Sequence, residues 1–386
     1  MRKFYTAEAV TEGHPDKLCD QIADAILDVC LKQDEQSRVA CEVLATKGTI
    51  IVAGEITSTY EPDVFAVVRK VLSDVGYSSE GIAMDTFVHR QSPDIAGAVD
   101  TSKERREGVS DNQMDWFQGA GDQGVMIGYA CDETKQLMPI PVVLANRIVR
   151  ELSACRQSSY IQGILPDGKA QVTVEYENGK PVRLDSVVVS CQHTEDKNLK
   201  KLEAEIRKKV LLPALRLLPP DEDTKIFINP SGRFVCGGMD ADTGLTGRKL
   251  MVDSYGSMVP HGGGAFSGKD CSKVDRSVAN MARYIAKNIV AARLASRCQV
   301  SLAYAIGVAQ PVMVQVDTFG TGKVCADDCL ELAIPLVFGL TPKQIVDSLR
   351  LTRPIFRQTA AFGHFGRKEF PWERTDKVEA LRNAVI

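Results

Sequence analysis

A glycine-rich run ending in lysine is the part of the sequence best suited to hold an anion. Residues 261–269 read HGGGAFSGK, and their G-x-x-x-x-G-K spacing differs from a Walker A loop because Asp270 stands where Ser or Thr would hold magnesium. No hydrophobic strand precedes the run, which also argues against a true P-loop. Its glycines leave backbone N–H groups free beside one ammonium, so we predict an anion site there.

More cations lie close to this run. Lys269, Lys273 and Arg276 are four and three residues apart, so any helical part of the stretch carries them on one face. A second glycine-flanked basic pair, Arg248 and Lys249, lies upstream in GLTGRK. Solvated surface lysines are the alternative for any one of them, but the clustering favours a single polyanion such as a polyphosphate.

Carboxylates suited to a hard cation are also present. Asp16 follows His14 in the first turn of a predicted helix, and Asp275 stands at capping-box spacing from Ser272. Helix capping alone explains both positions. Magnesium, however, favours one or two carboxylates combined with substrate phosphates. Other acidic residues near glycine-rich turns complete the supply of oxygen ligands: Asp122, Asp242 and Asp253.

Residues 119–124 match the spacing G-x-G-x-x-G of a dinucleotide-binding loop. A Rossmann loop follows a strand and opens a helix, whereas here a polar segment precedes and a β-like run, residues 125–130, follows. We therefore interpret these glycines as a turn or a close backbone approach to a ligand.

The elements that must position these residues follow one order three times: helix, β-hairpin, helix. The apolar spacing of Leu18, Ile22, Ile26 and Val29 illustrates the first helix. The predicted elements are residues 15–32, 38–44, 49–57 and 62–75; residues 139–155, 171–176, 181–190 and 195–212; and residues 274–289, 299–306, 312–317 and 342–350. We expect three similar α/β layers, each an antiparallel sheet with helices on one face.

Composition excludes several classes of protein. The chain has 386 residues and a net charge of −3, so no basic field draws it to nucleic acid or an anionic membrane. The longest apolar stretch near its end, residues 330–340, is interrupted by Glu331 and Pro335 and is shorter than the roughly 20 residues of a membrane span. The N-terminus lacks a signal-peptide core, so a cytoplasmic location is expected.

Neither a disulfide framework nor a zinc site is indicated. The 11 cysteines include no C-x-x-C pair, and the 5 histidines include no H-x-x-x-H pair. One segment, residues 95–118, is polar and without periodicity. Long segments of this kind are usually functional or linkers. We favour a mobile lid over an active site, with an interdomain linker as the alternative.

Several motifs resemble those of one family. Residues 119–129 (GAGDQGVMIGY) and 262–270 (GGGAFSGKD) are similar to the two signature segments of the S-adenosylmethionine synthetases, also called methionine adenosyltransferases. Further similar stretches are spread along nearly the whole chain: residues 12–17 (EGHPDK), 54–57 (GEIT), 91–95 (QSPDI), 229–235 (NPSGRFV), 244–249 (GLTGRK) and 363–372 (GHFGRKEFPW). Cys271, where many relatives have proline, and residues 96–116, which look unlike other members, are departures.

The resemblance implies an α/β fold of the α+β type, with three similar domains of antiparallel sheet plus helices around a pseudo-threefold axis. We expect domains at residues 1–100, 114–231 and 232–386. It also implies ATP and L-methionine as substrates, two Mg²⁺ per site and K⁺ as cofactors, and a homo-oligomer, either a dimer or a dimer of dimers, with sites between subunits. Nucleic acid and membranes are not expected partners.

Roles for individual residues come from the same resemblance. Catalytic roles fall to His14, Lys169, Arg248 and Lys269. ATP would be bound by these four together with Asp167, Arg233, Phe234, Asp242, Lys249 and Ala265. Methionine would be bound by Glu55, Gln91, Asp242 and Lys273. Asp16 and Asp275 would hold magnesium, and Glu42 would hold potassium.

The residue types suit that reaction. A thioether sulfur has no proton to lose when it attacks C5′ of ATP, so no general base is required. The leaving tripolyphosphate carries several negative charges, and preorganised cations stabilise it as it departs. Two rival functions remain: a P-loop-like phosphotransferase that uses the same glycines, and a nucleotide-sensing module that binds ATP without turnover.

Overall fold

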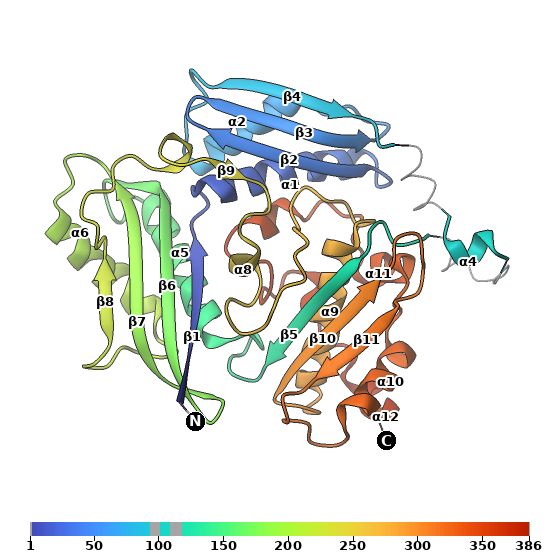
Figure 1. Ribbon diagram of the computed structural model, residues 1–386. Helices are drawn as coiled ribbons and strands as arrows, with labels where there is room; N and C mark the ends of the chain where they lie inside the picture. The colour runs from blue at the N-terminus through green and yellow to red at the C-terminus, as the bar shows by residue number, and fades with distance from the viewer. Residues whose placement is uncertain (1, 93–100, 109–117, 386) are drawn as a thin grey trace.

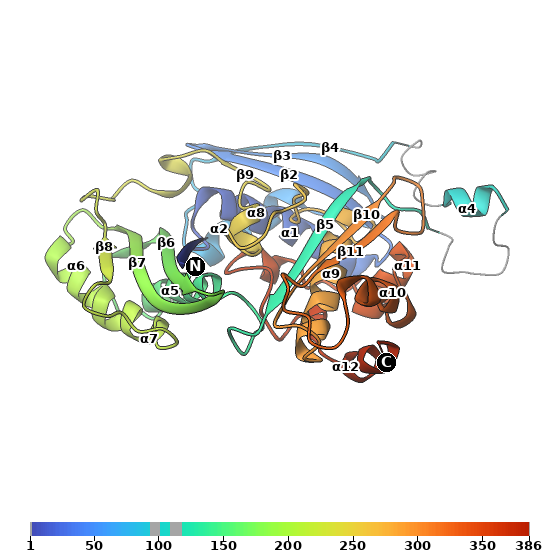
Figure 2. The same ribbon diagram turned by 60° about the horizontal axis from the view of Figure 1, so that its bottom comes forward.

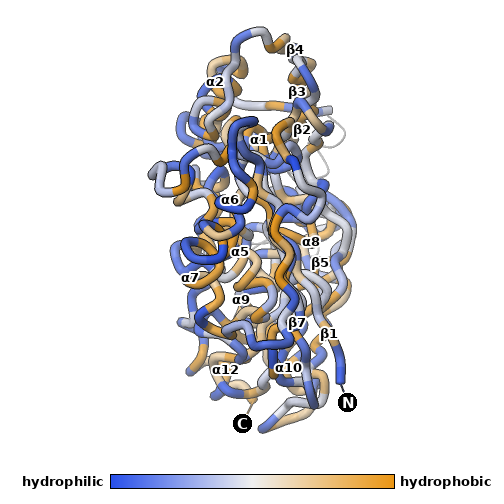
Figure 3. The backbone as a smooth tube through the Cα atoms, turned by 90° about the vertical axis from the view of Figure 1, so that its left-hand side faces the viewer, coloured by the Kyte–Doolittle hydropathy of each residue, from blue (hydrophilic) through white to orange (hydrophobic). Residues whose placement is uncertain are grey.

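The computed structural model describes residues 2–92, 101–108 and 118–385, and it contains three β-sheets (Figure 1). Their strand orders are β1-β6-β7-β8, β4-β3-β2-β9 and β11-β10-β5. The helices lie mainly on one side of the sheets (Figures 2 and 3). The α+β class is thus confirmed.

The first predicted unit is present with nearly the expected bounds. Helix α1, Pro15–Gln33, begins with proline in its first turn and buries Leu18, Ile22 and Ile26. Strands β2, Arg38–Thr46, and β3, Thr49–Thr57, form a hairpin, followed by α2, Val64–Val75, and β4, Ala83–His89.

The second unit repeats this order. Helix α5 is followed by a hairpin whose turn residues Asn178 and Gly179 have φ of 51° and 80°, the left-handed pair that a tight turn requires. Its elements are α5, Ile140–Gln157; β6, Ile164–Glu177; β7, Lys180–His193; α6, Leu199–Ile206; a π-helical turn, Arg207–Leu211; α7, Leu212–Ala214; and β8, Lys225–Ile228.

The third unit is built on α9, which is buried on nearly every side and packs against β5 and β10. Its elements are α9, Val274–Ala291; β10, Arg297–Tyr304; β11, Met313–Asp317; α10, Asp327–Val337; α11, Pro342–Leu349; and α12, Val378–Ala384. A short helix, α8, Leu250–Asp253, precedes it. Among the described residues no single helix could cross a membrane by length and composition; α10 and α11 pass that test only as a pair, bent by 76°.

Three strands join sheets that are otherwise formed by distant parts of the chain. Strand β1, Arg2–Val10, pairs with β6; β5, Gly124–Cys131, pairs with β10; and β9, Gly244–Leu245, pairs with β2. Each of the three sheets therefore contains a strand from a distant part of the chain. The domain bounds given above stay a prediction.

The expectation of purely antiparallel sheets was wrong in two places. Strand β4 runs parallel to β3, and β8 runs parallel to β7. In both cases a helical connection crosses from one strand to the next, as parallel pairing requires. The added strands follow the predicted hairpins, so the sheets are mixed.

Part of the proposed lid lies outside the described residues, namely 95–100 and 109–117. The part between contains the short helix α4, Lys103–Arg106. The Glu104 carboxylate accepts the N–H groups of Ala309, at 2.9 and 3.1 Å, and of Gln310, at 3.3 Å. The segment is thus tied to the loop that follows β10, and its role as a lid stays a prediction.

Candidate active site

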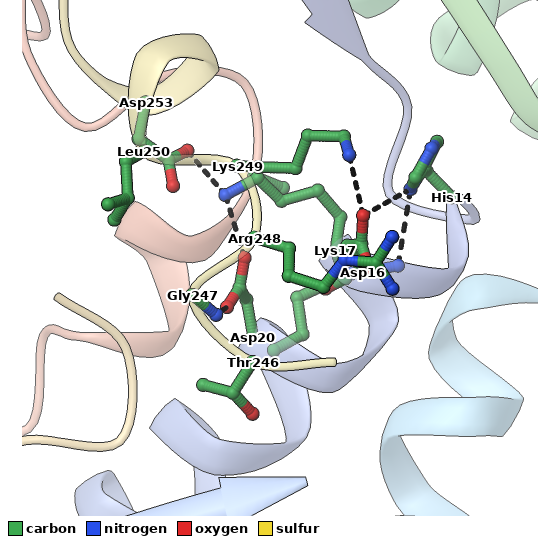
Figure 4. Close-up of polar contacts among 12 residues, drawn as sticks. His14, Asp16, Lys17, Asp20, Thr246, Gly247, Arg248, Lys249, Leu250 and Asp253 are labelled. Atoms are coloured by element: carbon green, nitrogen blue, oxygen red, sulfur yellow. Dashed lines mark hydrogen bonds and ion pairs between the residues drawn. The ribbon is translucent and has the colours of Figure 1, made fainter. Parts of the chain in front are cut away.

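The start of α1 gathers histidine, carboxylate and cations in one place (Figure 4). Strand β1 ends at Val10, which lies opposite Lys169 in β6, and the chain then turns into the helix through His14. Nδ1 of His14 accepts the N–H of Asp16 at 3.2 Å. Pairing of β1 with β6 therefore delivers His14 close to Lys169.

The imidazole of His14 is neutral at physiological pH. Burial, together with the positive charges of Lys249 and Lys169, lowers its pKa to about 3. Because Nδ1 accepts the Asp16 N–H, Nε2 carries the proton of the neutral ring. His14 can therefore donate a hydrogen bond to an anion without adding a charge.

Asp16 meets the basic pair of the GLTGRK loop. Its Oδ2 accepts Lys249 Nζ at 2.5 Å, and its Oδ1 accepts the Leu245 N–H at 3.0 Å and lies 3.7 Å from Arg248 Nε. Burial acts to raise the pKa of Asp16, but the bonds from Lys249 and Leu245 outweigh it and lower the pKa. The carboxylate stays ionised, as a cation ligand must.

A second cation–carboxylate pair lies at the start of α9. Lys269 Nζ is 2.6 Å from Asp275 Oδ2. The backbone at Gly264 packs directly against this carboxylate: a Cβ at Gly264 would lie only 2.1 Å from Asp275 Oδ1. Glu42 on β2 is a neighbour: partial burial raises its pKa, and the charge of Lys269 opposes that shift.

The two glycine-rich loops touch each other. A Cβ on Gly247 would lie 2.6 Å from the Cβ of Ala265. Gly244 lies on the first turn of α1, since its Cβ would be 2.2 Å from the Pro15 carbonyl oxygen. The basic pair Arg248 and Lys249 and the Lys269 loop therefore belong to one region.

Asp167 and Asp242 lie on the β6 side of this region. Oδ2 of Asp167 accepts the Gly238 N–H at 2.8 Å, whereas its buried Oδ1 has no partner among the described residues. Burial raises the pKa of Asp167, and the charge of Asp242 acts in the same direction. This oxygen is therefore a buried acceptor whose hydrogen-bonding capacity the described residues do not use.

Other candidate residues are engaged elsewhere within this chain. Glu55 pairs with His89 at 3.2 Å at an exposed end of β3, and the Gln91 N–H donates to Thr57. Lys273 pairs with the buried Asp270, which also accepts the Val39 N–H at 2.6 Å.

Arg233 and Phe234 lie on the loop after β8, and their contacts also lie elsewhere. Arg233 pairs with Glu195 at 2.7 Å, and the N–H of Phe234 donates to His193 at 3.0 Å. Among the contacts of the described residues, none joins Glu55, Gln91, Lys273, Arg233 or Phe234 to the cations described above.

The prediction that Arg276 belongs to the cation cluster was wrong. Helix α9 begins at Val274, so Arg276 alone of the three spaced cations is helical. Its side chain is buried, and both terminal nitrogens bond to Asp24 at 2.7 Å. It is therefore a structural ion pair and does not face a ligand.

No ready-made metal cage exists among the described residues: no group of three or more His, Cys, Asp or Glu side chains could hold an ion. The separate carboxylates Asp16 and Asp275, each beside a lysine, fit the way magnesium binds through one or two carboxylates and substrate phosphates.

Comparison with known proteins finds matches along nearly the whole chain. Three family models match in order: the N-terminal domain of S-adenosylmethionine synthetase at residues 2–98, the central domain at 117–234 and the C-terminal domain at 236–374. The chain belongs to the S-adenosylmethionine synthetase family. The S-adenosylmethionine synthase of Treponema denticola is 50% identical over 392 residues, which cover 99% of this chain and 98% of that protein. The resemblance drawn from the motifs is thereby confirmed.

Sequence reasoning missed two buried aspartates of α1 that hold the glycine-rich loops of this S-adenosylmethionine synthetase family member. Asp20 accepts the Gly247 N–H at 2.9 Å, and Asp24 accepts the Gly268 N–H at 2.8 Å. The signal was visible as an aspartate at every fourth position of α1, on a helix whose other face is apolar.

Proposed function

We propose that the chain is a methionine adenosyltransferase, an ATP-dependent enzyme that transfers the adenosyl group of ATP to the sulfur of L-methionine. It then hydrolyses the tripolyphosphate to phosphate and diphosphate. One observation carries the proposal: two glycine-rich cation loops meet on the first turns of α1, in a chain matched by the family from residue 2 to residue 374.

In this proposal the main catalytic effect is stabilisation of the leaving tripolyphosphate by cations. The thioether attacks C5′ without losing a proton, so the barrier depends on positioning and on the charge of the leaving group. Lys169, Arg248, Lys249 and Lys269 neutralise that charge. Neutral His14 donates a hydrogen bond from Nε2 to the departing oxygen. Each such donor typically contributes about 3–4 kcal/mol to transition-state stabilisation.

The metal assignments belong to the proposal as well. Asp16 and Asp275 would hold two Mg²⁺, which supply positive charge to the phosphates, and Glu42 would hold K⁺. Lys249 Nζ contacts Asp16 and Lys269 Nζ contacts Asp275, so we expect Mg²⁺ to displace each ammonium from the carboxylate as the phosphates bind. The ammonium groups of Lys249 and Lys269 therefore lie next to the expected positions of the phosphates.

Methionine would be bound by Glu55, Gln91, Asp242 and Lys273, and the adenosine part by Asp167, Arg233, Phe234 and Ala265.

A cavity of about 500 Å³ lies elsewhere, between β3, β4 and the start of α2, and the proposed phosphate-binding residues do not line it. As the family resemblance implies, we also propose a homo-oligomer, a dimer or a dimer of dimers, with sites completed between subunits. The cytoplasm remains the expected location.

Product identity tests the function directly. The purified chain is incubated with ATP, L-methionine, Mg²⁺ and K⁺, and the products are identified by mass. S-adenosylmethionine with phosphate and diphosphate supports the proposal. Formation of ADP would instead favour the phosphotransferase, and tight ATP binding without turnover would favour the sensing module.

A further inference from the structure

Helix α1 carries a row of aspartates on one face. Asp16, Asp20, Asp24 and Asp28 are each four residues apart, and the first three are at most 2% exposed. Like charges at this spacing repel each other, and buried carboxylates are costly unless they are paired. Each of the four accepts at least one backbone N–H from a residue between positions 245 and 357.

Asp20 fixes the loop that carries the basic pair. One carboxylate oxygen accepts the Gly247 N–H at 2.9 Å, and the other accepts Lys17 Nζ at 3.0 Å. The buried Lys17 is bonded in turn to Asp253, which lies in α8 just beyond Arg248 and Lys249 (Figure 4). Gly247 has φ of 79°, so the backbone turns at the bonded residue and then presents the two cations.

Asp24 fixes the second loop, which carries Lys269. Its Oδ1 accepts the Gly268 N–H at 2.8 Å, and Arg276 binds both of its oxygens at 2.7 Å. Arg276 also donates to the Lys269 carbonyl oxygen at 3.3 Å, so this ion pair holds the backbone on both sides of the turn before Lys269.

We propose that Asp20 and Asp24 are positioning residues, which set the distance between the Arg248–Lys249 pair and Lys269 so that both reach one polyphosphate chain. The two aspartates are about 6 Å apart along the helix axis, since a helix rises about 1.5 Å per residue. Because α1 is a rigid element and both loops are bonded to it, it fixes their positions relative to each other. This inference rests on the proposed function for the identity of the ligand.

Asp28 provides a matched control. Its two oxygens accept the N–H groups of Phe356 and Arg357, both at 2.9 Å, so it also anchors a loop, but that loop carries no predicted site residue. At all three positions both carboxylate oxygens accept hydrogen bonds. An Asp→Asn change therefore removes one acceptor in each case and leaves the shape intact.

The experiment uses the full chain and four double-mutant cycles, one for each aspartate–lysine pair, with inorganic tripolyphosphate as the probe in titration calorimetry. Lys249→Ala and Lys269→Ala are each made in the parent, in Asp20→Asn and in Asp24→Asn. We expect Asp20→Asn to reduce the loss caused by Lys249→Ala from about tenfold to about threefold or less, while the loss caused by Lys269→Ala is unchanged. Asp24→Asn is expected to give the opposite pattern.

Turnover provides the second measurement. Asp20→Asn and Asp24→Asn should lower kcat for S-adenosylmethionine formation about tenfold or more, with the KM for methionine unchanged, whereas Asp28→Asn should leave kcat within about twofold. Equal loss of kcat in Asp28→Asn, or binding losses that simply multiply in all four cycles, would overturn the inference. If Asp24→Asn does not fold, Arg276→Lys, which keeps the charge but loses the paired bonds, must show the same coupling to Lys269.

The binding cycles also separate this inference from the proposed function. Tripolyphosphate binding that follows the crossed pattern, in a chain that forms no S-adenosylmethionine, would support the positioning role and refute the activity. Formation of S-adenosylmethionine without the crossed pattern would do the reverse.

Discussion

Lys269 and Asp275 form an ion pair, with Nζ and Oδ2 2.6 Å apart, at the end of a glycine-rich loop and the start of α9. The pair joins the ammonium that we assign to a phosphate with the carboxylate that we assign to magnesium. Because Oδ2 cannot serve both partners fully, we expect this contact to loosen when the nucleotide and its metal ions bind.

Removing the ammonium tests its part in the chemistry. Lys269→Ala should lower kcat about a hundredfold or more, since one well-placed donor to a developing charge is worth about two to three orders of magnitude. The fold should persist, because the Lys269 side chain is partly exposed and only its ammonium and stem are removed. Steady-state kinetics and circular dichroism provide the measurements.

Lys343→Ala is the matched control, since it removes a similar lysine–aspartate pair on the exposed face of α11. A near-normal rate for Lys269→Ala would show that Lys269 only solvates the surface.

Asp16→Asn should raise the magnesium requirement. The amide keeps one oxygen for the Leu245 N–H, but its NH₂ group can neither accept the Lys249 bond nor bind a cation. We expect the Mg²⁺ concentration for half-maximal activity to rise about tenfold or more. An unchanged magnesium titration would leave Asp16 with a role at the helix dipole alone.

The neutral state of His14 predicts how stability depends on pH. Its pKa is about 3 in the folded chain, so below pH 6.5 the unfolded chain takes up a proton that the folded chain does not. Relative to His14→Gln, the parent should therefore lose about 1.4 kcal/mol of unfolding free energy for each pH unit below 6.5.

Urea unfolding of both proteins at pH 7, 6 and 5 measures this difference. The comparison must be differential, because burial raises the pKa of Asp28 to about 6, which acts in the opposite direction in both proteins. Parallel pH curves for the two proteins would show that His14 titrates normally.

The docking of α4 tests the lid. Glu104→Ala removes the carboxylate that accepts the N–H groups of Ala309 and Gln310. Hydrogen bonds to a charged group contribute about 1.5–3 kcal/mol, so we expect synthesis to fall about tenfold, while hydrolysis of added tripolyphosphate is little changed. Glu107→Ala, on the exposed end of the same segment, is the control. Equal losses in both reactions would favour a linker.

Local patterns predicted the local structure well. The spacing of Leu18, Ile22 and Ile26 placed α1, and the turn Asn178-Gly179 placed the second hairpin. The added strands β1, β4, β8 and β9 were missed. Both β5 and β10 were expected as β runs, but their pairing with each other was not, because pairing between distant segments leaves no periodicity within either one.

The site shows the same limit. Glycine-rich loops and family motifs pointed to His14, Asp16, Lys269 and Asp275. A charged residue within an amphipathic helix, however, ordinarily faces solvent. Asp24 and Arg276 are 252 positions apart in the sequence, so their shared burial depends on the tertiary fold and no local pattern encodes it.

The pairing of β1 with β6 has a consequence for synthesis on the ribosome. The first ten residues of the chain find their β-partner only after residues 164–177 have emerged, and β5 must wait in turn for residues 297–304. The three units therefore cannot mature one after another as each leaves the exit tunnel. We expect nascent chains that stop after the first or second unit to stay incompletely folded and to depend on chaperones until the last third arrives.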